Sequence, residues 1–101
     1  MVLKIKLHRR ARADLAAIKA YLMREAGARS AERVRTHLNA RILRLSRHPN
    51  LGITSDEPGI RILSPAKYPY RIYFTVTGDT VIVLHIRHTS LPLPEPGDVE
   101  A

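Results

Sequence analysis

Two neighbouring segments of the chain carry side chains that could act on a phosphate group. His85, Arg87 and His88 lie in one apolar segment, and Arg71 follows Tyr70 in the segment before it. A histidine can move a proton near neutral pH, and an arginine can hold a phosphate. Such a set could cut RNA by activating a ribose 2′-hydroxyl and stabilising the charge that develops on the phosphate.

The same residues also have a simpler interpretation. His85 lies between apolar residues of an expected strand, where a histidine is more often part of a core than of an active site. Arg71 and Arg87 could instead bind a carboxylate of a partner protein. No Asp or Glu lies close to these residues in the sequence to act as a second acid–base group. Cleavage and binding therefore both stay open.

The spacing of apolar residues predicts the first elements that must position these groups. Residues 2–7 alternate between apolar and basic, which is typical of a half-buried strand. A helical repeat then begins near Arg10, and Gly27 is expected to end this helix. A second amphipathic helix is expected from an N-cap at Ser30 to about His48, which precedes a proline.

The rest of the chain predicts strands. Residues 49–59 have the composition of a loop, and residues 60–63, 68–77 and 80–88 are rich in β-branched and aromatic residues. The order is β-α-α-β-β-β. Because both helices must bury an apolar stripe, the pattern predicts an α+β fold with a helical hairpin packed on one face of a small antiparallel sheet.

The loop Gly78-Asp79 predicts how the last two strands pair. A two-residue loop places Thr77 opposite Thr80, so that Ile72 would pair with His85 and Tyr70 with Arg87. Both faces of this hairpin carry apolar residues, and the helices can cover only one. We therefore expect the other face to present apolar surface to a partner.

Composition limits the class of protein. The 101 residues are enough for one domain, expected over residues 1–90, with a Pro-rich acidic tail over residues 91–101. Seventeen Lys and Arg against nine Asp and Glu give a net charge of +8, which indicates an acidic partner, either protein or nucleic acid. The absence of cysteine and of a long apolar run predicts a cytoplasmic protein that is not bound to a membrane.

Other kinds of site have little support in the sequence. His8, His37 and His48 lack the spacing of metal ligands, and there is no Gly-rich phosphate loop, so we expect neither a metal nor a cofactor. The arginines of the second helix could follow nucleic-acid phosphates or could simply face solvent, and the sequence does not decide between the two.

Five segments in order resemble bacterial toxins of the RelE/ParE superfamily. Residues 13–22 resemble their first helix, and residues 45–52 the end of the second helix with its Pro-x-x-Gly loop. Three strands follow, over residues 59–63, 68–74 (YPYRIYF) and 83–88 (VLHIRH). The Tyr-Arg-Ile-Tyr and His-Ile-Arg-His strands are most similar to the ParE branch.

The resemblance implies a toxin of a type II toxin–antitoxin module that inhibits DNA gyrase and is neutralised by a ParD-like antitoxin. It implies no hydrolytic active site, and we expect no direct binding of nucleic acid. The residues expected to contact the antitoxin or the target are Arg61, Tyr70, Arg71, Tyr73, His85, Arg87 and His88.

Two alternatives remain. RelE-like toxins cleave mRNA on the ribosome, and Arg71 matches an arginine of their Tyr-Arg strand. Catalytic residues would then be Arg71, His85, Arg87 and His88. Residues 89–94 lack the Arg, Lys, Tyr or His groups that usually follow the last strand of those nucleases, which favours a toxin that acts by binding. The third alternative is a basic nucleic-acid-binding module.

Overall fold

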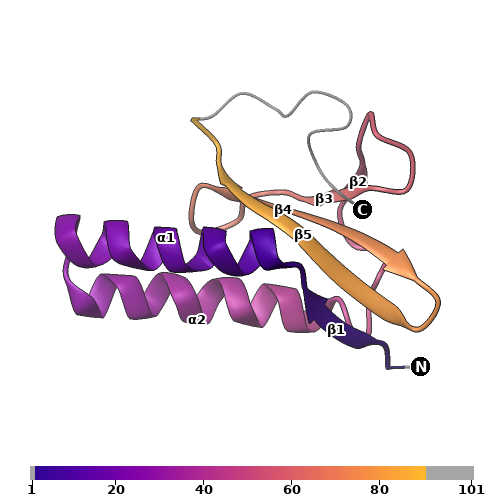
Figure 1. The fold of residues 1–101 in the computed structure, drawn as a ribbon, viewed down its shortest axis with the longest axis horizontal. Coiled ribbons are helices and arrows are strands. Elements are labelled where there is room, and N and C mark those ends of the chain that lie inside the picture. Colours follow the sequence, from indigo (N-terminus) through magenta and orange to yellow (C-terminus); the bar gives the residue numbers. More distant parts are fainter. Residues whose placement is uncertain (1, 91–101) are drawn as a thin grey trace.

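Two amphipathic helices lie side by side and pack against a five-stranded sheet (Figure 1). The computed structural model describes residues 2–90, so the predicted tail over residues 91–101 lies outside the described residues. The elements are β1 (Lys4–Leu7), α1 (Arg9–Glu25), α2 (Ala28–Arg44), β2 (Ile53–Thr54), β3 (Arg61–Leu63), β4 (Tyr70–Thr77) and β5 (Thr80–His88). The predicted order is thus confirmed, with one additional short strand in the segment expected to be a loop.

The turn between the helices is tighter than the sequence predicted. Helix α2 begins at Ala28, directly after Gly27, so the prediction that Ser30 is its N-cap was wrong. Only Ala26 and Gly27 separate the helices, and Gly27 has a φ of 92°, a conformation that glycine adopts without steric cost. Glu32 binds Arg35, whose Nε lies 3.0 Å from its Oε2. At the other end, α2 stops at Arg44 rather than near His48, and a turn follows.

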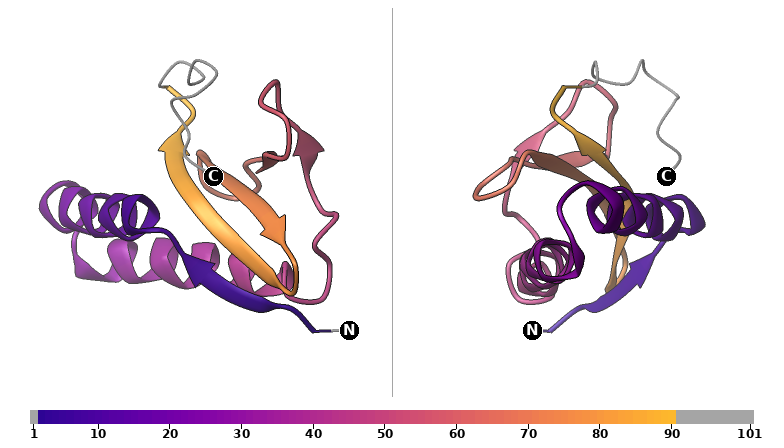
Figure 2. Two further views of the ribbon diagram at one scale, coloured as in Figure 1. Left: turned by 45° about the vertical axis from the view of Figure 1, so that its right-hand side comes forward. Right: turned by 90° about the vertical axis from the view of Figure 1, so that its left-hand side faces the viewer.

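The sheet has the order β1-β5-β4-β3-β2 and is mixed rather than wholly antiparallel. Strand β1 runs parallel to β5, with Lys4 opposite Thr80, whereas the other neighbours are antiparallel. The predicted α+β class with a helical hairpin on a sheet is confirmed. Between β1 and β5 the chain passes through both helices and the other strands, and β5 then runs alongside β1 in the same direction (Figure 2).

The main core lies between the helices and the sheet. Its helical side includes Leu38 and Leu45, and its sheet side includes Ile72, Phe74 and Val83, all at most 1% exposed. Each large apolar side chain buried in this way contributes about 1.5–3 kcal/mol of transfer free energy. This core holds α1 and β5 together, which is the contact on which the candidate site depends.

A β-bulge interrupts the predicted hairpin register. The pairs nearest the turn form as predicted, with Thr77 opposite Thr80. The register then shifts between Tyr73 and Phe74, so that Tyr73 pairs with His85. The predicted pairs of Ile72 with His85 and of Tyr70 with Arg87 were therefore wrong. Ile72 faces Ile86, and the corrected pairs at the end of the hairpin are Arg71 with Arg87 and Tyr70 with His88.

The other face of the sheet carries a second, smaller core. Ile60, Ile62, Tyr73 and Leu84 form it, and none of them is more than 9% exposed. The prediction that this face would present apolar surface was thus wrong for these residues. Leu84 is the residue that the bulge leaves without a cross-strand partner, and it packs into this cluster.

Candidate functional site

Asp14 of α1 lies against the part of β5 that β1 does not reach. Strand β1 pairs only with Thr80–Val83, which leaves the rest of that edge of β5 without a neighbouring strand. One carboxylate oxygen of Asp14 accepts the backbone N–H of Ile86 at 2.9 Å and contacts Nδ1 of His85. A side chain of the helix thus supplies the acceptor that a longer β1 would otherwise provide.

His85 is held through both of its ring nitrogens. Its Nε2 lies 3.2 Å from a guanidinium nitrogen of Arg87, and the side chain is 6% exposed. Because arginine can only donate, Nε2 must accept, and Nδ1 carries the hydrogen that it donates to Asp14. The three side chains form a chain of carboxylate, imidazole and guanidinium.

This chain suits positioning better than proton transfer. To act as a general base, His85 would have to use the Nε2 lone pair that accepts from Arg87. The arrangement fixes the direction of the Arg87 side chain, because Arg87 donates to Nε2 of an imidazole that Asp14 holds at Nδ1. Arg71 lies opposite Arg87 on β4 and adds a second guanidinium to the same part of the sheet. Such forked donors suit a carboxylate or a phosphate.

Tyr73 supports His85 rather than presenting a reactive hydroxyl. Its ring lies tilted to the imidazole, with the centroids 6.1 Å apart, and only 2% of the residue is exposed. Burial raises the pKa of the hydroxyl, and the nearby Arg71 and Arg87 oppose this shift. The hydroxyl is buried and has no hydrogen-bond partner in residues 2–90.

Tyr70 and His88 form the helix-facing side of the same end of the hairpin. Tyr70 packs into the main core, and its ring meets that of His88 edge-on at 5.4 Å. Burial raises the pKa of the Tyr70 hydroxyl, and Tyr21 adds to the shift. His88 Nδ1 accepts the backbone N–H of Ser90 at 3.0 Å.

Arg61 lies apart from the other predicted site residues. It is on β3, opposite Phe74, whereas the others gather where β4 begins and β5 ends. One guanidinium nitrogen of Arg61 donates to the carbonyl oxygens of Asn50 and Gly52, at 2.8 and 3.0 Å. Its position indicates a role in holding the preceding loop.

A groove runs between α1 and the end of β5. It has a volume of about 810 Å³, and Ile18, Leu22 and Tyr70 supply apolar lining. Its polar lining includes Arg10, Asp14, His85, Arg87 and His88. Four of the seven predicted site residues therefore line a concave surface, namely Tyr70, His85, Arg87 and His88.

The sequence reasoning missed Asp14 and the contribution of α1. A signal was present: Asp14 is the first acidic residue of a strongly basic segment, and it directly precedes Leu15 on the apolar stripe of the helix. Within residues 2–90, no group of three or more His, Cys, Asp or Glu is arranged to hold a metal ion. In the same range, no helix has the length and apolar character needed to cross a membrane.

Known proteins share both the sequence pattern and the fold. A family described as the ParE toxin of type II toxin-antitoxin system, parDE, matches residues 5–91. A solved structure of the chromosomal ParDE toxin–antitoxin system from P. aeruginosa is 26% identical with a TM-score of 0.79, and the match covers 86% of this chain and 96% of that one. No curated protein matches the chain.

Two further solved structures share the fold at lower identity. A mutant of the E. coli toxin RelE in the free state is 17% identical with a TM-score of 0.61, over 85% of this chain and 82% of that one. The toxin–antitoxin complex RelBE2 from Mycobacterium tuberculosis is 17% identical with a TM-score of 0.65, over 87% and 99%.

Proposed function

The chain belongs to the family of ParE toxins of type II toxin–antitoxin systems, and we propose that it acts by binding DNA gyrase and is neutralised by a ParD-type antitoxin. The observation that carries the choice of binding over catalysis is the engagement of both nitrogens of His85, by Asp14 and Arg87. A group held in this way orients a neighbour and exposes no free base.

The groove between α1 and β5 is the proposed site for the antitoxin. Its apolar lining from Ile18 and Leu22 suits the apolar side of an amphipathic segment. Arg10 and Arg87 lie at the same groove and suit acidic side chains of that segment. The +8 net charge would further speed the encounter with an acidic partner.

A ribosome-dependent endoribonuclease is the second candidate, and the contact between Asp14 and His85 favours it. A carboxylate that orients a histidine is a common arrangement in acid–base catalysis. The catalytic set would be Arg71, His85, Arg87 and His88, with Arg87 leaving His85 when the RNA phosphate binds. This candidate requires the 6% exposed imidazole to become accessible.

Two assays on the purified chain separate the candidates. We expect inhibition of gyrase supercoiling and intact mRNA on translating ribosomes. Ribosome-dependent cleavage that disappears in His85→Ala or Arg71→Ala would overturn the proposal in favour of the nuclease. Inhibition of neither system would overturn both.

A binding assay tests the antitoxin groove. We expect Arg87→Gln to weaken the binding of the cognate antitoxin by about tenfold, since a charge-assisted hydrogen bond contributes about 1.5–3 kcal/mol. Lys6→Gln removes the same charge from the exposed edge strand β1 and serves as the control. Equal effects of the two substitutions in isothermal titration calorimetry would place the antitoxin elsewhere.

A further inference from the structure

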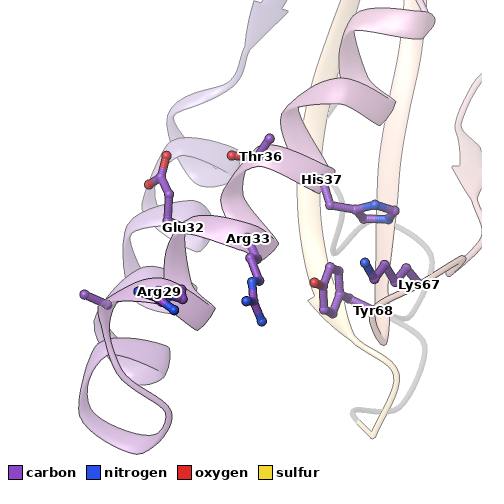
Figure 3. Close-up of a pocket in the computed structure, with 8 residues that line it drawn as sticks. Arg29, Glu32, Arg33, Thr36, His37, Lys67 and Tyr68 are labelled. Carbon is purple, nitrogen blue, oxygen red and sulfur yellow. The ribbon is translucent and has the colours of Figure 1, made fainter.

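A second concave surface lies on α2, apart from the Asp14–His85–Arg87 chain. It has a volume of about 620 Å³ and is formed by the first half of α2 and by Lys67 and Tyr68, which precede β4. Figure 3 shows Arg33, Lys67 and Tyr68 around this pocket, with Lys67 pointing toward the Tyr68 ring, and Arg29 lies one helical turn before Arg33. Tyr68 also lines the groove between α1 and β5, so the two surfaces adjoin there.

The cations of this pocket are not neutralised within the described chain. Arg29, Arg33 and Lys67 form no ion pair with a carboxylate of residues 2–90. The one carboxylate in the lining, that of Glu32, is bound by Arg35 through two guanidinium nitrogens. Three positive charges therefore face one concave surface with their donors available to an anion.

The pKa of His37 is sensitive to the positive charges of this region. Its ring meets that of Tyr68 edge-on, with the centroids 5.1 Å apart, and its Nε2 is buried without a partner in residues 2–90. Burial lowers the pKa of His37, and the positive charges of Arg41 and Lys67 lower it further. Cations that disfavour a protonated imidazole will favour a bound anion for the same reason.

The positive surface continues beyond the pocket along α2. At 100° per residue, Arg29, Arg33 and Arg44 fall within about 60° of one another on the helix. They span about 22 Å of helix length, since each residue adds about 1.5 Å. Arg41 lies at the margin of this stripe and donates to the carbonyl oxygen of Ser64, which ties α2 to the segment that carries Lys67.

We propose that this pocket and stripe bind the phosphodiester backbone of a single nucleic-acid strand. A row of cations matches a polymer with a charge on every unit, and each guanidinium can hold a phosphate through two hydrogen bonds. An acidic amphipathic segment would bury its large apolar side chains against others of that kind, and Tyr68 is the one large apolar side chain among the lining residues of this pocket. Lys67 Nζ lies over one face of the Tyr68 ring, 5.6 Å from its centroid, so a base of the strand would stack on the other face.

The inference is separate from gyrase inhibition, and it differs from the sequence-based expectation of no direct nucleic-acid binding. That expectation came from the resemblance, which does not show that Lys67 and Tyr68 come together with Arg29 and Arg33. The experiment below contains no gyrase and no antitoxin, so it can fail or succeed independently of the proposed function.

Fluorescence anisotropy with the full chain and a labelled 12-nucleotide single strand tests the site. Each phosphate contact contributes about 0.7 to the slope of log affinity against log salt for a single strand. Arg29→Gln/Arg33→Gln should therefore reduce this slope by about 1.4 and weaken binding by about tenfold or more at about 0.1 M salt. Lys6→Gln/Arg9→Gln removes two exposed charges elsewhere and should have a much smaller effect.

Two results would overturn the proposal. Equal losses in the two double variants would show attraction by net charge alone. A Glu-rich peptide that binds through Arg29 and Arg33 while the oligonucleotide does not bind would assign the site to an acidic protein. Far-UV circular dichroism of each variant checks that its fold is retained.

Nuclear magnetic resonance of His37 gives an independent readout. A bound phosphate should raise the pKa of His37, because the negative charge favours the protonated ring. Inorganic phosphate serves as a second probe. A rise in the pKa of His37 that is much larger with the oligonucleotide than with inorganic phosphate supports binding of a strand. An unchanged His37 titration at saturating oligonucleotide would place binding elsewhere and overturn the proposal.

Discussion

Asp14 and His85 lie 71 residues apart in the chain and are joined by a hydrogen bond at the edge of β5. The bond forms just beyond the last residue that pairs with β1. Asp14 therefore has two roles, since it closes an open strand edge through Ile86 and orients the imidazole that holds Arg87. Stability and the geometry of the candidate site depend on one carboxylate.

Substitution of Asp14 should destabilise the protein. Asp14→Ala leaves the backbone N–H of Ile86 and the ring N–H of His85 without their acceptor. We expect the free energy of unfolding to fall by about 2–4 kcal/mol. Asp14→Asn keeps one acceptor oxygen and should lose less. Urea unfolding measures both, and Glu25→Ala on the exposed end of the same helix is the control. A loss in Asp14→Ala no larger than in the control would contradict the assigned contacts.

Two glycines provide a matched test of the loop before β3. A Cβ on Gly52 would lie 2.4 Å from the carbonyl oxygen of Ile62, whereas one on Gly59 would meet nothing within 4 Å. Both have a positive φ, so Gly59→Ala should cost about 1–2 kcal/mol from backbone strain alone. Gly52→Ala should cost clearly more, because the β2–β3 backbone must also move. Thermal unfolding compares the two, and equal costs would contradict the close approach.

Tyr73→Phe should change the alkaline stability of the protein. Burial raises the pKa of Tyr73 in the folded chain above the value near 10.0 in the unfolded chain. The protonated tyrosine therefore makes its full contribution to the free energy of unfolding below the unfolded pKa, and this contribution is lost as the pH rises through the folded pKa. Phenylalanine cannot ionise, and it also removes a buried hydroxyl that has no partner in residues 2–90.

We therefore expect Tyr73→Phe to be neutral or slightly stabilising at pH 7 and to lose less stability than the parent between about pH 9 and pH 11. Urea unfolding at a series of pH values measures the difference between the two proteins. Identical pH profiles would show that the Tyr73 hydroxyl is in contact with water.

Arg61 was predicted to contact a partner, and its hydrogen bonds lead to a different expectation. Arg61→Lys keeps the charge but removes the guanidinium group, one nitrogen of which donates to the carbonyl oxygens of Asn50 and Gly52. We expect faster hydrogen exchange in the loop over residues 49–54 and little change in antitoxin affinity. A large loss of antitoxin affinity with unchanged hydrogen exchange in the loop would show that Arg61 contacts the partner, as the sequence predicted.

Much of the fold follows from local patterns in the sequence. The periods of the apolar residues predicted both helices, and the alternating and β-branched segments predicted four of the five strands. Strand β5 occupies the predicted residues 80–88. These elements were predictable because apolar spacing along a segment reflects which of its faces is buried.

Features that depend on contacts between distant segments were not predictable in the same way. Leu84 fits a regular strand as well as a bulge, so nothing in the segment signals that the register changes between Tyr73 and Phe74. The partner of His85 comes from a helix at the other end of the chain. Six of the seven predicted site residues still gather at one end of the hairpin, because they belong to adjacent strands whose turn was correctly identified.

The position of β5 in the sheet sets the order in which the protein can be completed during synthesis. β5 is the last of the described strands along the chain, yet it lies between β1 and β4 (Figure 2). Strand β1, made first among the strands, has no neighbour in the sheet until Thr80–Val83 have been made. The groove also needs β5, so an antitoxin that binds there can recognise the toxin only after nearly all of residues 2–90 have left the ribosome.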